Sequence, residues 1–106
     1  MAVYLHVTFT LDAHHVALYE QIYAEEFLPV LRSLGMEAVG IWKTLVGRAG
    51  EFTEIWRFED IGDYERKWTA LMSDPRVLAI FEKTGPLVNG ETFKLMVAAP
   101  FGEPSV

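Results

Sequence analysis

The chain contains no cysteine, no basic run and no long apolar run. The missing thiols exclude disulfides, thiolate zinc sites, iron–sulfur clusters and a cysteine nucleophile. Fifteen acidic residues against nine basic ones give a formal charge of −6. This balance argues against a nucleic-acid partner, because Lys and Arg contacts to phosphates supply most of that affinity. It disfavours anionic membrane surfaces for the same reason.

Further absences bear on location and on cofactors. No apolar stretch approaches the roughly 20 residues needed to span a bilayer, and the N-terminus lacks the basic-then-apolar order of a signal peptide. We therefore expect a cytoplasmic protein without a membrane partner. Gly47 and Gly50 lack the Lys-Ser/Thr ending of a phosphate-binding loop, and neither a Ser/His/Asp triad nor a metal-ligand cluster is evident. We expect neither a metal nor a cofactor.

What the chain does contain is a large apolar fraction, 51% of 106 residues, with seven Phe, four Tyr and three Trp. This composition is typical of a folded globular chain and not of a disordered one. The length suffices for one hydrophobic core and is too short for a second. We therefore predict a single domain over residues 1–106.

The apolar periodicity predicts alternating strands and helices. A period of two predicts strands over residues 2–10, 37–46, 52–58 and 91–99. Three- and four-residue spacing predicts a helix from an N-cap at Asp12 to about Leu34, interrupted at Pro29 and ended by Gly35. Asp60 or Asp63 should begin a second helix, and Asp74-Pro75 should separate it from a third that ends at Gly85.

The inward faces of the last two helices follow from the same spacing. The residues predicted to face the core are Ile61, Tyr64, Trp68, Leu71 and Met72 in the second helix, and Val77, Leu78, Phe81 and Thr84 in the third.

The element order β-α-β-β-α-β predicts an α+β, ferredoxin-like fold, an antiparallel four-stranded sheet with helices over one face. Residues 52–58 carry bulky or apolar side chains on both sides of the strand, so the second face of the sheet also needs cover. A second copy of the chain would supply that cover through a two-fold contact between sheet faces. We therefore expect a homodimer.

Several short stretches have an order and spacing that are hard to obtain by accident. They are residues 27–32 (FLPVLR), 39–42 (VGIW) with Gly47, 55–59 (IWRFE), 74–75 (DP), and 85–87 (GPL) with 99–101 (APF). With these stretches the chain resembles, over nearly its whole length, the NIPSNAP family of dimeric α+β barrel proteins. The resemblance implies a homodimer whose two sheets meet as a barrel, with a ligand cleft between each sheet and its helices.

This superfold hosts cofactor-free oxygenases, lactone isomerases, mutarotases, polyketide cyclases and haem-degrading enzymes, as well as members without known activity. The resemblance therefore leaves the function open. The chain differs from many family members at Leu5 and Val7, where Glu and Arg are common. It also differs at Leu45, where Glu is frequent, and at Glu54, where His is frequent. These differences imply a more apolar pocket.

Glu54 is the first candidate for chemistry. It shares one face of its strand with Trp56, and Lys43 lies in the neighbouring strand. A carboxyl group in an apolar cleft has a raised pKa and can act as a general base, whereas a nearby Lys would oppose that shift. The alternative is a structural ion pair or a half-exposed strand residue.

Tyr19 and Tyr23 lie one turn apart on the first helix. Their phenols could donate to a ligand while their rings pack, and the alternative is that both rings are ordinary core residues. His6 is interpreted as a structural or interface residue. His14 and His15 point about 100° apart around a helix, so we expect them to be poor joint metal ligands.

The leading hypothesis is binding of a small apolar or aromatic molecule in the cleft between sheet and helices. Glu54 and Tyr19 are the candidate catalytic residues, and the candidate ligand-binding residues are Leu5, Tyr23, Ile41, Lys43 and Trp56. If the protein is an enzyme, which the sequence leaves open, a cofactor-free oxygenase or isomerase is favoured. The alternative is a non-catalytic dimeric interaction protein with a closed core.

Overall fold

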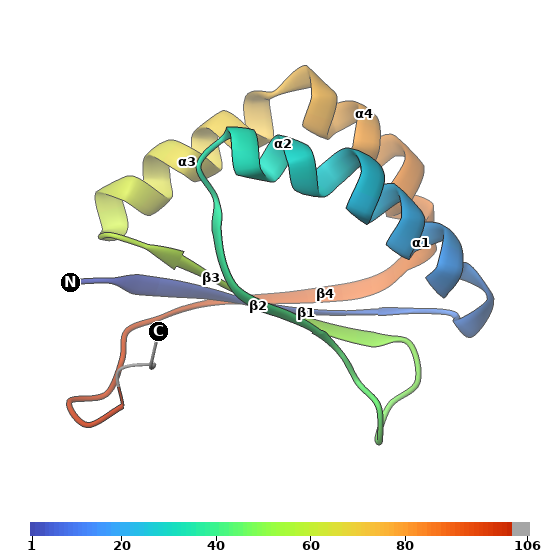
Figure 1. Ribbon diagram of the computed structural model, residues 1–106, viewed down its shortest axis with the longest axis horizontal. Coiled ribbons are helices and arrows are strands. Elements are labelled where there is room, and N and C mark those ends of the chain that lie inside the picture. The colour runs from blue at the N-terminus through green and yellow to red at the C-terminus, as the bar shows by residue number, and fades with distance from the viewer. Residues whose placement is uncertain (103–106) are drawn as a thin grey trace.

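The computed structural model describes residues 1–102 and places all helices on one side of a four-stranded antiparallel sheet (Figure 1). The strands are β1 (Val3–Leu11), β2 (Glu37–Lys43), β3 (Glu51–Phe58) and β4 (Val88–Met96), in the spatial order β2-β3-β1-β4. The helices are α1 (Val16–Ile22), α2 (Leu28–Ser33), α3 (Ile61–Ser73) and α4 (Pro75–Thr84). This is the predicted ferredoxin-like α+β fold. Residues 103–106 of the predicted domain lie outside the described part.

β1 is a central strand and organises the core. Its alternation turns five apolar side chains toward the helices, and all five are at most 5% exposed: Val3, Leu5, Val7, Phe9 and Leu11. β3 pairs with one side of β1 and β4 with the other, so that Val7 lies between Glu54 and Phe93. Residues from two strands that lie far from β1 and from each other in the sequence are thereby brought to one surface.

The first helical segment is interrupted, as predicted, but by a π-helical turn over Tyr23–Phe27 that precedes Pro29. Pro29 itself lies in the first turn of α2. Proline has no N–H to donate, and its ring clashes with the carbonyl four residues earlier in a regular α-helix. A π-helical turn immediately before it relieves both problems by widening the backbone.

For this helical segment, the predicted C-terminal end was confirmed, but the predicted N-terminal cap was not. Gly35 ends it as predicted, with φ of 80° and a hydrogen bond from the Met36 N–H to the Leu31 carbonyl at 3.0 Å. Asp12 holds the N-cap position of a short 3₁₀ turn, Ala13–His15, but its side chain does not cap that turn. Its Oδ1 instead accepts a hydrogen bond from Asn89 Nδ2 at 2.7 Å.

Two predicted strand boundaries were wrong. β2 stops at Lys43 and not at residue 46, because the Thr44 N–H closes the hairpin loop on the Glu51 carbonyl at 2.9 Å. Leu45 and Val46 then lie in that loop, more than 90% exposed. β4 begins at Val88, three residues early, because a 3₁₀ turn at Gly85–Leu87 delivers the chain directly to the end of β1.

Most of the inward-facing helix residues were predicted correctly. Asp60 caps α3 by accepting the Asp63 N–H at 2.7 Å. Three predicted core residues are instead substantially exposed: Ile61 (57%), Met72 (44%) and Leu78 (45%). They lie at the margins of each apolar stripe, where the rotation of the helix against the sheet decides which side chain is covered. In α4 this rotation buries Ile80 in place of Leu78.

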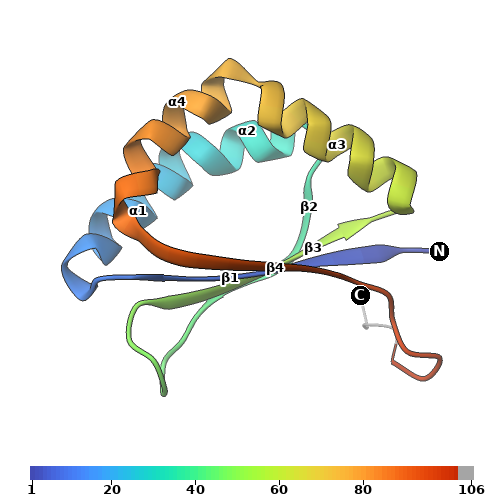
Figure 2. The same ribbon diagram turned by 180° about the vertical axis from the view of Figure 1, so that it is seen from behind.

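The sheet face opposite the helices has a different character. In both views of the ribbon the helices lie on the other side of the sheet, and no helix of residues 1–102 covers this face (Figure 2). Trp42 lies on it, 50% exposed, with its indole ring over Gly40. A Cβ atom at position 40 would collide with that ring, so the glycine permits the indole to lie flat on the sheet.

The helices are all short. Among the described residues, none forms a helix long and apolar enough to cross a membrane.

Phe58 offers a test of the core. It is 1% exposed beneath α3, and the Phe58→Ala substitution should lower the free energy of unfolding by about 3–5 kcal/mol because it leaves a cavity. Denaturant unfolding at a fixed protein concentration measures this. Phe101→Ala, at a position 94% exposed, should change stability by less than about 0.5 kcal/mol. Equal effects of the two substitutions would contradict the core assignment.

Candidate functional site

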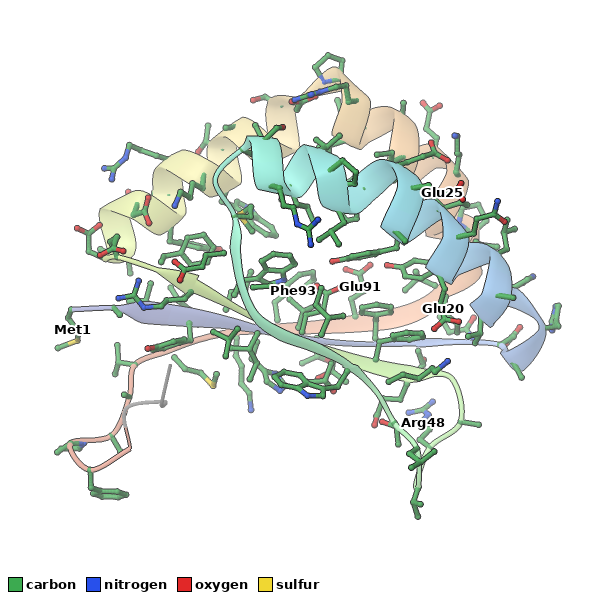
Figure 3. All side chains as sticks on the ribbon, viewed as in Figure 1. Met1, Glu20, Glu25, Arg48, Glu91 and Phe93 are labelled. Atoms are coloured by element: carbon green, nitrogen blue, oxygen red, sulfur yellow. The ribbon has the colours of Figure 1, made fainter. Side chains whose placement is uncertain are left out.

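A cavity of about 360 Å³ lies between the sheet and the helices. Side chains of β1, β3 and β4 form its floor, and the helices form its roof. Its aromatic lining residues are Phe9, Tyr19, Phe27, Trp56, Trp68, Phe81 and Phe93. Only two of its lining residues are ionisable at neutral pH, Glu54 and Glu91. Figure 3 shows Glu91 and Phe93 on the side of the sheet that faces the helices.

A second, smaller cavity of about 260 Å³ lies on the β2 side of the same layer. Of the predicted site residues, Tyr23, Ile41 and Lys43 line this smaller cavity and not the larger one. Tyr19 and Glu54 line both cavities, as does Phe9. Glu54 therefore stands where the two spaces approach each other.

Glu54 is only 7% exposed, because the alternation of β3 places its side chain among the core residues. Trp56, two residues along the same face, donates a hydrogen bond from Nε1 to Glu54 Oε1 at 3.0 Å. Burial raises the pKa of Glu54 above its ordinary value. The hydrogen bond from Trp56 and the nearby Tyr23 phenol oppose that rise, and the charge of Glu91 adds to it.

The two tyrosines are held as neutral hydrogen-bond donors. Burial is the main cause that raises the pKa of both Tyr19 and Tyr23, and the Glu54 carboxyl group raises each further. Their ring centroids lie 5.9 Å apart, and Tyr19 packs against Phe9 at 5.3 Å. Within residues 1–102 the buried Tyr23 hydroxyl meets no acceptor in good hydrogen-bond geometry, although Glu54 lies near it.

Lys43 does not form an ion pair with Glu54 in the part of the chain that the structure describes. The strand register places Ile41 opposite Glu54, and Lys43 opposite Phe52. Lys43 Nζ instead contacts Glu20 Oε2 on α1 at 3.0 Å, with both side chains about half exposed. The alternative that Lys43 neutralises the buried carboxyl group is therefore not realised.

The structure places the predicted site residues around the two cavities. Leu5 and Trp56 line the larger cavity, while Ile41 belongs to the smaller one. Sequence reasoning missed Glu91 and Phe93 of β4, as well as the roof residues Trp68 and Phe81. Glu91 and Phe93 lie two residues apart on one face of a predicted strand. Pairing that strand with the first one in the correct register would have placed both side chains in the cavity.

One exposed group could hold a metal ion among residues 1–102. Donor atoms of Asp12, His14 and His15 lie within 4.8 Å of one another, and the two imidazole centroids are 4.0 Å apart. The two side chains approach each other more closely than their 100° separation on a helix suggests, because they lie on a 3₁₀ turn; whether they are joint metal ligands stays a prediction. The group lies on the exposed turn between β1 and α1, and it lines neither cavity.

The protonation of Glu54 can be tested through stability. Below the ordinary value of 4.5, Glu54 is protonated in the folded and unfolded chain alike. As the pH rises, the unfolded chain ionises first, so stability is lost until the raised folded pKa is passed. Glu54→Gln removes this loss. The variant should therefore gain stability relative to wild type between about pH 4 and about pH 8.

Urea unfolding at the two pH values measures the difference. Glu65→Gln, at an exposed position of α3, controls for the loss of one formal charge. A Glu54→Gln effect that is the same at both pH values would contradict the raised pKa.

The chain is similar in sequence and in fold to known proteins. The NIPSNAP family model matches residues 4–103. No curated protein is significantly similar to the chain. Among solved structures, a NIPSNAP family protein with unknown function from Agrobacterium tumefaciens, Atu4242, is 27% identical with a TM-score of 0.87. The match covers 95% of this chain and 91% of that one.

Two further solved structures show how widely the fold is used. A second NIPSNAP family protein from Agrobacterium tumefaciens, Atu5224, is 14% identical, with a TM-score of 0.88 and coverage of 96% and 97%. A mutant of SnoaB, a cofactor-independent oxygenase from Streptomyces nogalater, is 16% identical, with a TM-score of 0.68 and coverage of 92% of each chain. At these identities the likeness extends to the fold alone.

Proposed function

Since the chain belongs to the NIPSNAP family, we propose that it binds a small, largely apolar or aromatic molecule in the larger cavity between its sheet and its helices. The observation that carries this proposal is the buried Glu54 carboxyl group at the wall of a mostly aromatic cavity of about 360 Å³. Ligand sites are typically clefts of roughly 300–1,000 Å³, apolar with a few polar groups. The alternative of a closed core requires this space to be filled.

The polar groups support a proton-transfer reaction in this cavity. Glu54, with its raised pKa, can accept a proton from an acidic C–H or O–H group of the ligand. Tyr19 remains a neutral donor and can stabilise the oxyanion that forms. A cofactor-free oxygenase or an isomerase is the reaction class that uses these steps. The likeness to SnoaB adds an analogy of fold.

We further propose that two copies of the chain associate through the sheet faces that the helices leave uncovered. Trp42, half exposed over Gly40, is the apolar side chain on which such a contact would centre. Aromatic residues are enriched in the buried centres of protein interfaces. A second copy is the favoured partner because a two-fold contact would cover both exposed indoles at once.

Ligand binding can be tested with a cavity-filling variant. A thermal-shift panel of aromatic ketones, phenols and lactones should contain compounds that stabilise the protein, by about 2.7 kcal/mol at a hundredfold excess over the dissociation constant. Val88→Phe adds a ring at the cavity wall and should abolish the stabilisation. Val97→Phe, at a 56% exposed position, should leave it intact. A panel without any stabilising compound would count against the proposal.

The dimer can be tested with a matched pair of surface substitutions. Trp42 on the sheet face and Leu18 on α1 are exposed almost equally, at 50% and 49%. Light scattering should give twice the 12.0 kDa chain mass for wild type and for Leu18→Glu. Trp42→Glu should shift the protein to the single-chain mass, because a charge would be buried without a partner. A monomeric wild type would disprove this contact.

A further inference from the structure

The ionisable groups of the larger cavity carry one sign. Its lining residues include Glu54 and Glu91. Within residues 1–102, they include no Lys, Arg or His. The two carboxyl groups flank β1 from opposite sides, since Glu54 lies opposite Val7 and Glu91 lies opposite Phe9. Val7 and Phe9 point to the same face, so both carboxyl groups border the same space.

The cation that lines the neighbouring smaller cavity is already paired. Lys43 borders only the smaller cavity, and its ammonium group contacts Glu20 at 3.0 Å. Two carboxyl groups that border one apolar space repel each other when both are ionised; Glu54 is buried, whereas Glu91 is exposed and therefore partly screened by solvent. A positive charge from outside the chain would stabilise the ionised form of both carboxyl groups, a role that no cation among the cavity's lining residues in 1–102 fills.

The remaining lining suits a cation as well. Faces and edges of seven aromatic rings border the space, including Trp56, which is 3% exposed, and Trp68, which meets Phe93 edge-on at 5.9 Å. The negative faces of aromatic rings attract ammonium groups, and this attraction strengthens when water is excluded. The formal charge of −6 on the whole chain adds a favourable long-range field for cations.

We propose that the ligand of the larger cavity is an organic cation, an amine whose ammonium group lies near Glu54 and Glu91 and whose apolar body packs among the aromatic rings. This inference rests on the proposed ligand-binding function and assigns a charge to the ligand. An anionic ligand would be repelled by each carboxyl group that is ionised. A neutral ligand of the same shape would gain no ionic attraction from either carboxyl group.

A set of ligands that differ only in charge tests the inference. Naphthylmethylamine, its trimethylammonium analogue, naphthalenemethanol and naphthoate share one ring system and carry positive, fixed positive, neutral and negative charge. In calorimetric titrations at neutral pH, the two cations should bind about tenfold or more tightly than the alcohol. Naphthoate should bind most weakly.

Substitution of each carboxyl group shows which residue causes the preference for cationic ligands. Glu91→Gln should weaken binding of both cations several-fold and leave the affinity for the alcohol unchanged. Glu54→Gln should remove most of the remaining preference for cations. Glu65→Gln removes the same formal charge from an exposed position of α3, outside both cavities, and should leave every affinity unchanged.

Proton release gives an independent readout. The groups that face Glu54 are the phenols of Tyr19 and Tyr23, the Trp56 indole and the Glu91 carboxyl group. Burial raises the pKa of both carboxyl groups, so a bound cation would favour their ionised form and displace any proton that they carry. The fixed cation should release protons on binding in wild type and fewer in Glu54→Gln, as measured in buffers of different ionisation enthalpy.

The possible outcomes separate this inference from the function on which it rests. Tighter binding of the cations, lost on substitution of the two carboxyl groups, would support it. Binding of the alcohol or naphthoate as tightly as the amine would overturn the charge assignment and leave the ligand-binding function standing. Failure of all four compounds to bind, together with failure of the aromatic panel, would overturn both.

Discussion

The burial of one carboxyl group, Glu54, is the constraint around which the helix-facing side of the sheet is arranged. The alternation of β3 turns Phe52, Glu54, Trp56 and Phe58 to the same side, and all four are at most 7% exposed. A buried carboxyl group without partners is costly, so it must be hydrogen-bonded or stay protonated. The Trp56 indole meets the first need, and the raised pKa reflects the second. An apolar residue would serve the core better, which is why this position is the most informative about function.

Part of the helical layer lies close to that carboxyl group. The π-helical turn that precedes Pro29 carries Tyr23 at its start and Phe27 at its end. Tyr23 lies near Glu54, while Phe27 meets Phe81 of α4 edge-on at 5.7 Å. The π-helical turn that accommodates Pro29 thus also places the Tyr23 phenol near Glu54. Through Phe27 it brings this helical segment into contact with α4 above the cavity. Such π-helical turns are frequent at functional sites.

The two faces of the sheet are chemically distinct. The helix side holds the cavities and the buried Glu54. The opposite side presents Trp42 over Gly40, half exposed, and carries no helix of residues 1–102. Since strand side chains alternate between faces, one strand can serve both surfaces. In β2, Ile41 pairs with Glu54 on the helix side, whereas Trp42 pairs with Thr53 and lies over Gly40 on the opposite face. Ligand binding and association are thereby proposed for opposite sides of the same four strands.

The sequence by itself determined the element order, the ferredoxin-like fold, the family resemblance and the position of Glu54 on a strand among apolar neighbours. These follow from local periodicity and from short motifs, which act over a few residues. Only the tertiary structure decided that Ile41 and not Lys43 lies opposite Glu54, and that Glu91 and Phe93 complete the cavity. Strand register, and the helix rotation that buries Ile80 in place of Leu78, depend on packing between segments far apart in the chain. No local pattern encodes that packing, because each choice is settled by which whole arrangement buries the most apolar surface.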